Sequence, residues 1–273
     1  MSAELRLSVR PARGVQGWTP SDKWLGWLVP LLLLACWELA GRNGLLPRYL
    51  VSPSVIIQSW LAMAADGELM ANTTASLFRQ SVGFAIGAIG GVLAGLLAGM
   101  LRPVERFYEP LISLTYPVPK IAILPLIFAW FGLGDTSKII VIAISIFYPV
   151  YISAYYGAKS LSRVHVWTAQ NAGAGRGEIF RHVVFPSALP DIFNGLRIGL
   201  ALSFVLMVTT ELVVSSSGLG YMIGRAEENL RFDRMYVAIL TIAIIGFCAD
   251  RLLLHIRKRV LVGQLLGKER GHE

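Results

Sequence analysis

Four ionisable residues lie within or at the edges of strongly apolar stretches: Glu38, Arg197, Glu211 and Asp250. A charge inside a bilayer is costly and usually faces protein or water, so each residue is a candidate to bind an ion or a substrate. Glu38 and Asp250 lie near the ends of their stretches, which favours solvated positions at the membrane interface. Arg197 and Glu211 lie near the inner and outer ends of one predicted span, about 21 Å apart along a helix, so they cannot pair within it.

Five polar residues of this predicted span form the candidate translocation path. Arg197 has the charge to attract an anion, or it extends to the cytoplasmic surface as a snorkelling side chain. Glu211 would repel an anion, which favours a structural partner or a gate. Ser203, Thr209 and Thr210 carry hydroxyls that bind substrate or bond back to their own helix.

The sequence contains no group of residues that would catalyse a reaction or hold a metal. A phosphate-binding loop has the pattern G-x-x-x-x-G-K-[ST], and the nearest match, Gly157-Ala158-Lys159-Ser160, lacks the glycine before the lysine. No nucleophile stands beside a base, and Cys36 and Cys248 lie in apolar stretches as small buried residues. The histidines, His165, His182, His255 and His272, have no metal-ligand spacing. We therefore predict no enzyme and no cofactor in this chain, so that any energy from ATP comes from a partner.

The composition is that of a protein embedded in a membrane. Of 273 residues, 55% are hydrophobic and 15% are charged, whereas soluble domains have about 25% charged residues. The formal net charge of +8 raises the question of nucleic acid binding. The basic residues are spread over short loops, without a basic face that carries interleaved aromatics, which excludes nucleic acid as a partner. We expect an all-α, polytopic protein in a lipid bilayer.

Six membrane spans follow from the apolar stretches, at residues 24–40, 81–101, 120–131, 139–158, 192–214 and 235–254. The outer loop 41–80 contains a predicted helix, 54–65, that would rest in the membrane interface. Prolines break the segment 108–134, so we expect an interfacial helix up to Tyr116 and then a short third span with Lys120 at its cytoplasmic end. A further outer loop covers residues 215–234.

Lysines and arginines set the orientation of these spans. The segments predicted inside hold sixteen of them and those predicted outside hold seven, Arg79 among the latter, as positive-inside topology requires. Both termini are then cytoplasmic, with tails at 1–23 and 263–273 around a transmembrane domain at 24–262. This arrangement is that of a multi-pass membrane protein.

The second predicted span carries glycines at an unbroken spacing of four: Gly83, Gly87, Gly91, Gly95 and Gly99. This spacing places them on nearly one helix face, where a neighbouring helix can approach closely. We therefore predict helix packing for this face.

The segment 163–190 is the longest sequence between two apolar stretches without a plausible span of its own. Its first part, 166–172, favours a helix, and Gly173 and Gly175 allow a tight turn. A second short helix follows, with Glu178 in its first turn, an apolar stripe that includes Val183, and Pro186 as its end. Arg163, Arg176 and Arg181 place the loop in the cytoplasm, where such a helix can dock in a groove of another protein.

This segment resembles the cytoplasmic EAA loop of permeases from ATP-binding-cassette (ABC) importers. The family's glycine falls on Gly173, its apolar position on Val183 and its proline on Pro186; its Glu-Ala-Ala start reads Trp167, Thr168 and Ala169. Three further stretches resemble the nitrate, taurine and alkanesulfonate branch of these permeases. They are Tyr116-Pro117-Val118-Pro119-Lys120 with Leu124-Pro125-Leu126, Trp130-Phe131-Gly132-Leu133-Gly134, and Gly195-Leu196-Arg197-Ile198-Gly199 leading to Glu211 and Gly218-Leu219-Gly220-Tyr221.

The resemblance implies a six-helix permease of the type I importer fold that works as a homodimer. It also implies a cytoplasmic ATPase pair, which binds ATP and Mg, and an external substrate-binding protein. The ATPase-coupling residues would be Val166, Trp167, Thr168, Ala169, Gln170, Asn171, Gly173, Glu178, Val183 and Pro186. The substrate implied is a small anion such as an alkanesulfonate, taurine or nitrate, with an aromatic carboxylate or a vitamin precursor as the alternative. A secondary transporter driven by ions is the competing class.

Overall fold

The computed structural model describes residues 22–269, with side chains at 27–162 and 164–261. The predicted N-terminal tail lies almost wholly outside the described residues, which omit 1–21 and 270–273, whereas residues 263–269 of the predicted C-terminal tail are helical. All described elements are helices, as the sequence predicts. The chain divides into two compact units, Met1–Ser54 and Val55–Glu273.

The first unit contains α1 (Asp22–Arg42), which covers the predicted first span. Glu38, near its end, accepts hydrogen bonds from Arg42 Nε at 2.6 Å and from the backbone N–H of Ser54 at 2.9 Å. The first bond lies within α1, and the second ties the end of α1 to Ser54, the last residue of this unit. Glu38 is therefore a structural residue of this unit.

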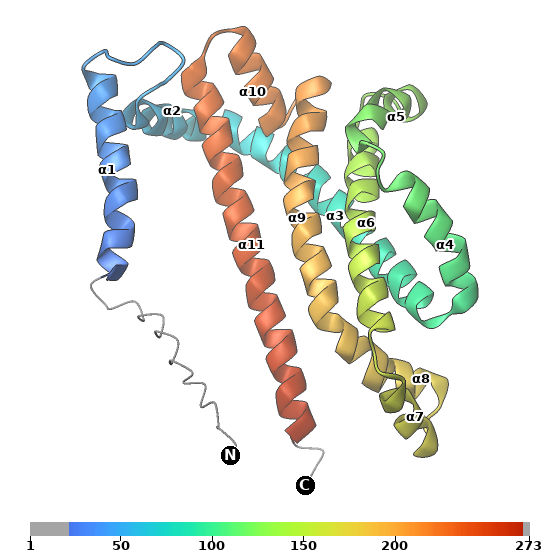
Figure 1. The fold of residues 1–273 in the computed structure, drawn as a ribbon. Helices are drawn as coiled ribbons and strands as arrows, with labels where there is room; N and C mark the ends of the chain where they lie inside the picture. The colour runs from blue at the N-terminus through green and yellow to red at the C-terminus, as the bar shows by residue number, and fades with distance from the viewer. Residues whose placement is uncertain (1–21, 270–273) are drawn as a thin grey trace, which may run out of the picture. The chain divides into compact units, whose positions relative to one another are not determined.

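The second unit is built on three long helices that lie side by side: α3 (Glu68–Met100), α6 (Asp135–Lys159) and α9 (Phe185–Val213) (Figure 1). α6 packs between the other two. Its buried residues Ile142, Ile146 and Val150 form the centre of the apolar core. This three-helix core positions every residue discussed below.

Glycines allow α6 to approach both neighbours closely. The five predicted packing glycines of α3 all face α6, and a Cβ at Gly87 would lie 2.4 Å from the carbonyl oxygen of Ala143. On the other side of α6, a Cβ at Gly195 of α9 would lie 2.9 Å from the carbonyl oxygen of Pro149. Real Cβ atoms do not approach a backbone oxygen that closely, so only glycine fits at these positions.

The second predicted span is longer than expected. α3 begins at Glu68 and has 33 residues, so the prediction of a loop up to residue 80 is wrong for residues 68–80. Ser76, Arg79 and Gln80 are buried in this added part. Polar residues can extend the helix here because their side chains bond to other helices rather than to water.

The proline-rich segment forms a bent pair of helices. α4 (Arg102–Thr115) is followed by a short turn and by α5 (Leu124–Phe131), and the two halves are bent by 89°. The helix predicted to end at Tyr116 is present as α4, which ends at Thr115. Its rings pack along α6, with Tyr108 at 5.4 Å from Tyr151 and Tyr116 at 6.2 Å from Tyr148, centroid to centroid.

The segment 163–190 contains α7 (Arg163–Asn171) and α8 (Arg176–Ile179), which continues through a π-helical turn (Phe180–Val184) into α9. The prediction that Pro186 ends a short helix is wrong. Pro186 stands in the first turn of α9, where a missing N–H is tolerated because the π turn before it rearranges the hydrogen bonds. The helix therefore runs without a break from Arg176 to Val213.

Three more helices complete the second unit, and the long α11 (Phe232–Glu269) runs beside α9 (Figure 1). α10 (Leu219–Glu228) occupies the predicted outer loop 215–234, and α11 contains the predicted last span. The predicted helix 54–65 is present as α2 (Pro53–Ala65). Trp60 of α2 donates to the Thr241 hydroxyl of α11 at 3.1 Å, so α2 is held by protein contacts.

Four described helices are long and apolar enough to cross a membrane, and the bent pair α4–α5 raises the number to five if it counts as one span. They are α3, α6, α9 with the preceding turn from Arg176, and α11. The count of six and the orientation of the termini stay predictions. Below, the two ends of the core are called the α7 end and the α10 end.

Candidate coupling and translocation sites

The α7 end presents a helix with two different faces. Val166 and Ala169 of α7, together with Val183, pack against a core cluster that includes Ile179 and Ala188. On the opposite face Trp167 is 57% exposed, and Gln170 and Asn171 are also exposed. The predicted coupling residues thus divide into a set that braces α7 and a set that faces outward.

The end of α7 has the hydrogen bonds of a Schellman motif. Gly173 N–H donates to Gln170 O at 2.9 Å, and Ala174 N–H donates to Ala169 O at 3.0 Å. Gly173 has a φ of +85°, in the left-handed region that glycine adopts without strain. The motif fixes the direction in which the chain leaves α7, so α7 is held rigidly against the start of α8.

Glu178 and Thr168 serve the backbone of their own segments. A carboxylate oxygen of Glu178 accepts from Gly175 N–H at 2.8 Å, which caps the first turn of α8. The Thr168 hydroxyl donates to Val164 O at 2.9 Å. Neither contact depends on a partner protein.

The five candidate path residues do not gather at one site. Ser203, Thr210 and Glu211 are buried, and Thr209 donates to Val205 O of its own helix at 2.8 Å. Ser203 accepts from the Gln80 side chain of α3 at 2.9 Å. Arg197 differs from the three buried residues, because its side chain is 53% exposed.

Arg197 pairs with Asp250 of α11 through two hydrogen bonds, at 2.7 and 3.2 Å. The predicted position near the inner end of its span is wrong. Gly195 packs on Pro149 and Ser153, and Gly199 packs on Ile146, which places Arg197 level with the middle of α6. An arginine held by both oxygens of a carboxylate is largely neutralised.

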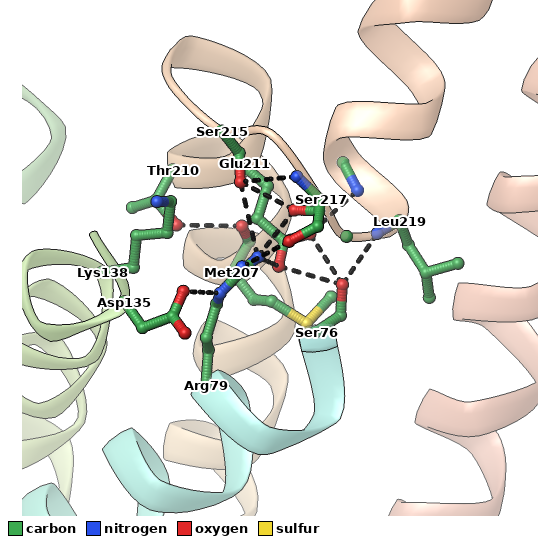
Figure 2. A network of polar contacts seen from close by, with 12 residues as sticks. Ser76, Arg79, Asp135, Lys138, Met207, Thr210, Glu211, Ser215, Ser217 and Leu219 are labelled. Carbon is green, nitrogen blue, oxygen red and sulfur yellow. Dashed lines mark hydrogen bonds and ion pairs between the residues drawn. The ribbon is translucent and has the colours of Figure 1, made fainter. Parts of the chain in front are cut away.

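The α10 end contains a buried ionic network centred on Arg79 (Figure 2). Arg79 donates to Asp135 at 2.6 Å, to Glu211 at 2.7 Å, and to both the carbonyl and the hydroxyl of Ser217, at 2.7 and 2.8 Å. Glu211 also accepts from the Ser76 hydroxyl at 2.7 Å. One guanidinium therefore joins α3, α6, α9 and the loop before α10.

Lys138 lies beside this network and is 2% exposed. Its ammonium donates to the carbonyl oxygens of Leu133 and Gly134, at 2.8 and 3.2 Å. With Lys138, the cluster holds two cations and two carboxylates, Asp135 and Glu211. Its net charge is zero, which limits the cost of burying Arg79, Lys138 and Glu211, while the Asp135 side chain remains 51% exposed.

Gly218 and Gly220 close the network over Glu211. A Cβ at Gly218 would lie 2.4 Å from the Glu211 carboxylate, and Gly220 N–H donates to that carboxylate at 3.0 Å. The motif Gly218-Leu219-Gly220-Tyr221 is thus explained by the close approach of its backbone to a buried carboxylate. The expectation that Glu211 has a structural partner agrees with these contacts.

Arg79 was missed as a site residue because it was assigned to an outer loop. It stands four residues before Gly83, which continues the spacing of the glycine stripe. Arg79 therefore lies on the same face of α3 as the glycines that pack on α6. One turn before Gly83, this face meets Asp135, the first residue of α6. An arginine in line with a packing stripe is the signal that would have revealed a buried cation.

A pocket of about 550 Å³ opens at the α10 end and is lined by arginines of α10 and α11. Arg225 donates to the Tyr221 hydroxyl at 2.5 Å, and this bond raises the pKa of Arg225. Hydrogen bonds to Asp233 likewise raise the pKa of Arg231. Arg234 pairs with Glu68 at 3.1 Å.

Comparison with known proteins agrees with this geometry. Residues 91–262 match the family model "Binding-protein-dependent transport system inner membrane component". This chain belongs to that family. The putative aliphatic sulfonates transport permease SsuC of Escherichia coli is 37% identical over 85% of this chain and 90% of its own length. The taurine transport permease TauC of the same organism is 36% identical over 84% and 86%.

The fold is also that of a solved importer permease. A chain of the MetNI methionine ABC transporter, in an inward-facing conformation, superposes with a TM-score of 0.58 at 16% identity, over 69% of this chain and 94% of that one. The present protein is therefore a multi-pass permease subunit of an ABC importer in the inner membrane. It is not an enzyme: ATP hydrolysis belongs to a separate chain, and a substrate-binding protein is the other partner of the family.

Proposed function

We propose that this permease imports a small organosulfonate of the alkanesulfonate or taurine type. The observation that carries the proposal is the identity of 37% to a sulfonate permease and 36% to a taurine permease, in each case over most of both chains. Nitrate carries the same single negative charge as an alkanesulfonate, but neither of these two relatives is named as a nitrate permease. The substrate is delivered by the external binding protein, and ATP with Mg binds only on the partner ATPase.

In this proposal the α7 end is cytoplasmic and transmits the motion of the ATPase. The exposed face of Trp167, Gln170 and Asn171 docks in a groove of the ATPase, while the packed face of Val166 and Ala169 passes the motion to α9. Support comes from the rigid Schellman turn and from the unbroken helix that starts at Arg176. The arginine pocket at the α10 end then faces the binding protein.

Two copies of the permease form the path in this proposal. The helices α3, α6 and α9 pack through glycines with no room for a solute between them. A path must therefore run over the surface of this core, and a second copy supplies the opposite wall. Each copy would dock one ATPase.

The test of the substrate is reconstitution of the permease with its genomically neighbouring ATPase and binding protein in liposomes. ATP hydrolysis is measured with the binding protein loaded in turn with ethanesulfonate, taurine, nitrate and benzoate. We expect a sulfonate to stimulate hydrolysis and to accumulate inside the vesicles. Stimulation by benzoate or nitrate alone would contradict the proposal.

Replacing Gly173 with valine is expected to uncouple hydrolysis from transport. Valine in the left-handed region costs about 1–2 kcal/mol, so α7 would lose its fixed direction while the spans remain intact. We expect normal insertion, with little stimulation of the ATPase by loaded binding protein. Gly177→Ala is the matched control, because Gly177 lies in the same segment without a positive φ and has nothing within 4 Å of an added Cβ. Normal coupling in Gly173→Val would contradict the role of the turn.

Trp167→Ala tests the docking face itself. Because the side chain is 57% exposed, its loss should leave the unfolding temperature of the permease unchanged. Loss of an aromatic side chain from the centre of an interface should weaken binding of the ATPase about tenfold or more. The affinity of the two purified proteins in detergent measures this directly. Unchanged affinity would show that α7 does not dock through Trp167.

A further inference from the structure

Lys120 lies at the bend between α4 and α5, and the contacts of its side chain place it level with the middle of α6, a helix long enough to cross the membrane. The ammonium is 4.3 Å from the centroid of the Tyr148 ring. Tyr148 stands 13 residues after the start of α6 at Asp135 and 11 before its end at Lys159. At 1.5 Å per residue these separations are about 20 and 16 Å, on either side of the middle of a bilayer core about 30 Å thick.

The predicted position of Lys120 at the cytoplasmic end of a span is therefore wrong. α4 begins beside the end of α6, where Glu105 bonds to Tyr155 and Lys159, and it reaches the level of Tyr148 after four turns. The break that follows leaves the lysine at this depth. Proline residues prevent a continuous helix here, and the lysine stands directly after Pro119.

The surroundings of the Lys120 ammonium are polar but uncharged. It donates to the carbonyl oxygens of Thr115 and Tyr116, at 3.3 and 2.5 Å, and it faces the rings of Tyr116 and Tyr148. Among the described residues no carboxylate forms an ion pair with it, whereas Lys159 and Arg197 each pair with one carboxylate and Arg79 pairs with two. Carbonyls and aromatic faces stabilise a cation without neutralising it.

An ammonium has three donors, and the two carbonyls account for two of them. The side chain is only partly buried, and Tyr116 beside it is 54% exposed. One donor and a full positive charge are therefore accessible from the surface of the core. In secondary transporters, substrate sites lie near the midplane where a helix is interrupted. In membrane proteins generally, an ionisable residue within the membrane is a candidate functional site, and we apply the same physical argument to this permease.

We propose that Lys120 binds the sulfonate group of the substrate half-way across the membrane. This inference rests on the proposed function, since a sulfonate is the anion that the relatives' names indicate. The flanking rings of Tyr116 and Tyr148 hold the ammonium in place, so that the substrate gains one charge-assisted hydrogen bond without reorganisation of the site. Arg197, at the same depth, does not compete for the anion because Asp250 neutralises it.

The test compares Lys120→Gln and Lys120→Arg in the complete transporter reconstituted in liposomes. We expect Lys120→Gln to lower the initial rate of ethanesulfonate import at least tenfold, with basal ATP hydrolysis within twofold of the wild type. Lys120→Arg keeps the charge and should retain at least a third of the import rate. Arg106→Gln is the control, because it removes one exposed positive charge from α4 near its other end.

A second measurement reports on binding without turnover. Val118→Cys is placed beside the site in a background of Cys36→Ser and Cys248→Ser, since both native cysteines are exposed. Ethanesulfonate should slow the reaction of this cysteine with a neutral maleimide when Lys120 is present, and it should not do so in Lys120→Gln.

The outcomes separate the two proposals. Import by Lys120→Gln at the wild-type rate, or equal protection of the cysteine in both backgrounds, overturns the site and leaves the sulfonate importer intact. Loss of assembly or of basal ATP hydrolysis in both Lys120 variants also overturns the proposed binding site. Lys120 would then have a structural role in stabilising the bend between α4 and α5. If the assembled wild type imports no sulfonate, the proposed function is wrong and the site falls with it.

Discussion

Arg79→Met is expected to destabilise the permease strongly, although Arg79 lies far from the predicted coupling loop. The change removes the cation that four segments share and leaves Glu211, 1% exposed, without its ion-pair partner. Breaking a buried ion pair from one side costs about 3–5 kcal/mol. We expect a lower unfolding temperature in detergent and much less protein in the membrane fraction.

The matched comparison for Arg79 is an exposed pair at the same end of the molecule. Arg234→Gln breaks the contact with Glu68, where both side chains are about 40% exposed, and surface pairs contribute about 1 kcal/mol or less. The double variant Arg79→Met/Glu211→Met should lose less stability than the sum of the single changes, because neither charge remains unpaired. Equal effects of Arg79→Met and Arg234→Gln would show that the network contributes no more than a surface pair.

The second large effect is expected at Gly87. Gly87→Ala adds a single methyl group, which would lie 2.4 Å from the carbonyl oxygen of Ala143. The backbone of α6 cannot turn away as a flexible side chain can, so α3 and α6 must separate. Forcing extra volume into a packed core typically costs about 1–3 kcal/mol of stability. Because the added methyl group meets a backbone oxygen, we expect the loss of stability to lie at the upper end of this range.

Gly90→Ala provides the control on the same helix, three residues away. Its added Cβ would meet only the ring of Phe147, at 3.5 Å, which is ordinary contact. Alanine is a better helix former than glycine by about 1 kcal/mol, so Gly90→Ala should be neutral or stabilising. The unfolding temperatures of the two variants should therefore shift in opposite directions. A similar shift in both would contradict the close packing of α3 on α6.

The sequence by itself determined the class of the protein and much of its organisation. Low charge and long apolar stretches indicate a membrane protein because each span must satisfy its backbone within one helix. The repeated spacing of four in Gly83–Gly99 predicted one packing face, since helical period alone decides which residues share a face. Gly173 was identified as a turn for the same local reason: its conformation depends on a few neighbouring residues.

Only the tertiary structure decided which of the polar residues act together. Arg79 and Glu211 are 132 residues apart in the chain, and no local pattern links them. Pro186 does not end its helix, because a π turn ahead of it accommodates the missing donor. The depth of Lys120 depends on how α4 folds back along α6. That no described carboxylate pairs with it depends on where the other described segments lie. Charge pairing in a membrane is set by contacts between helices, and these contacts exist only once the helices have packed.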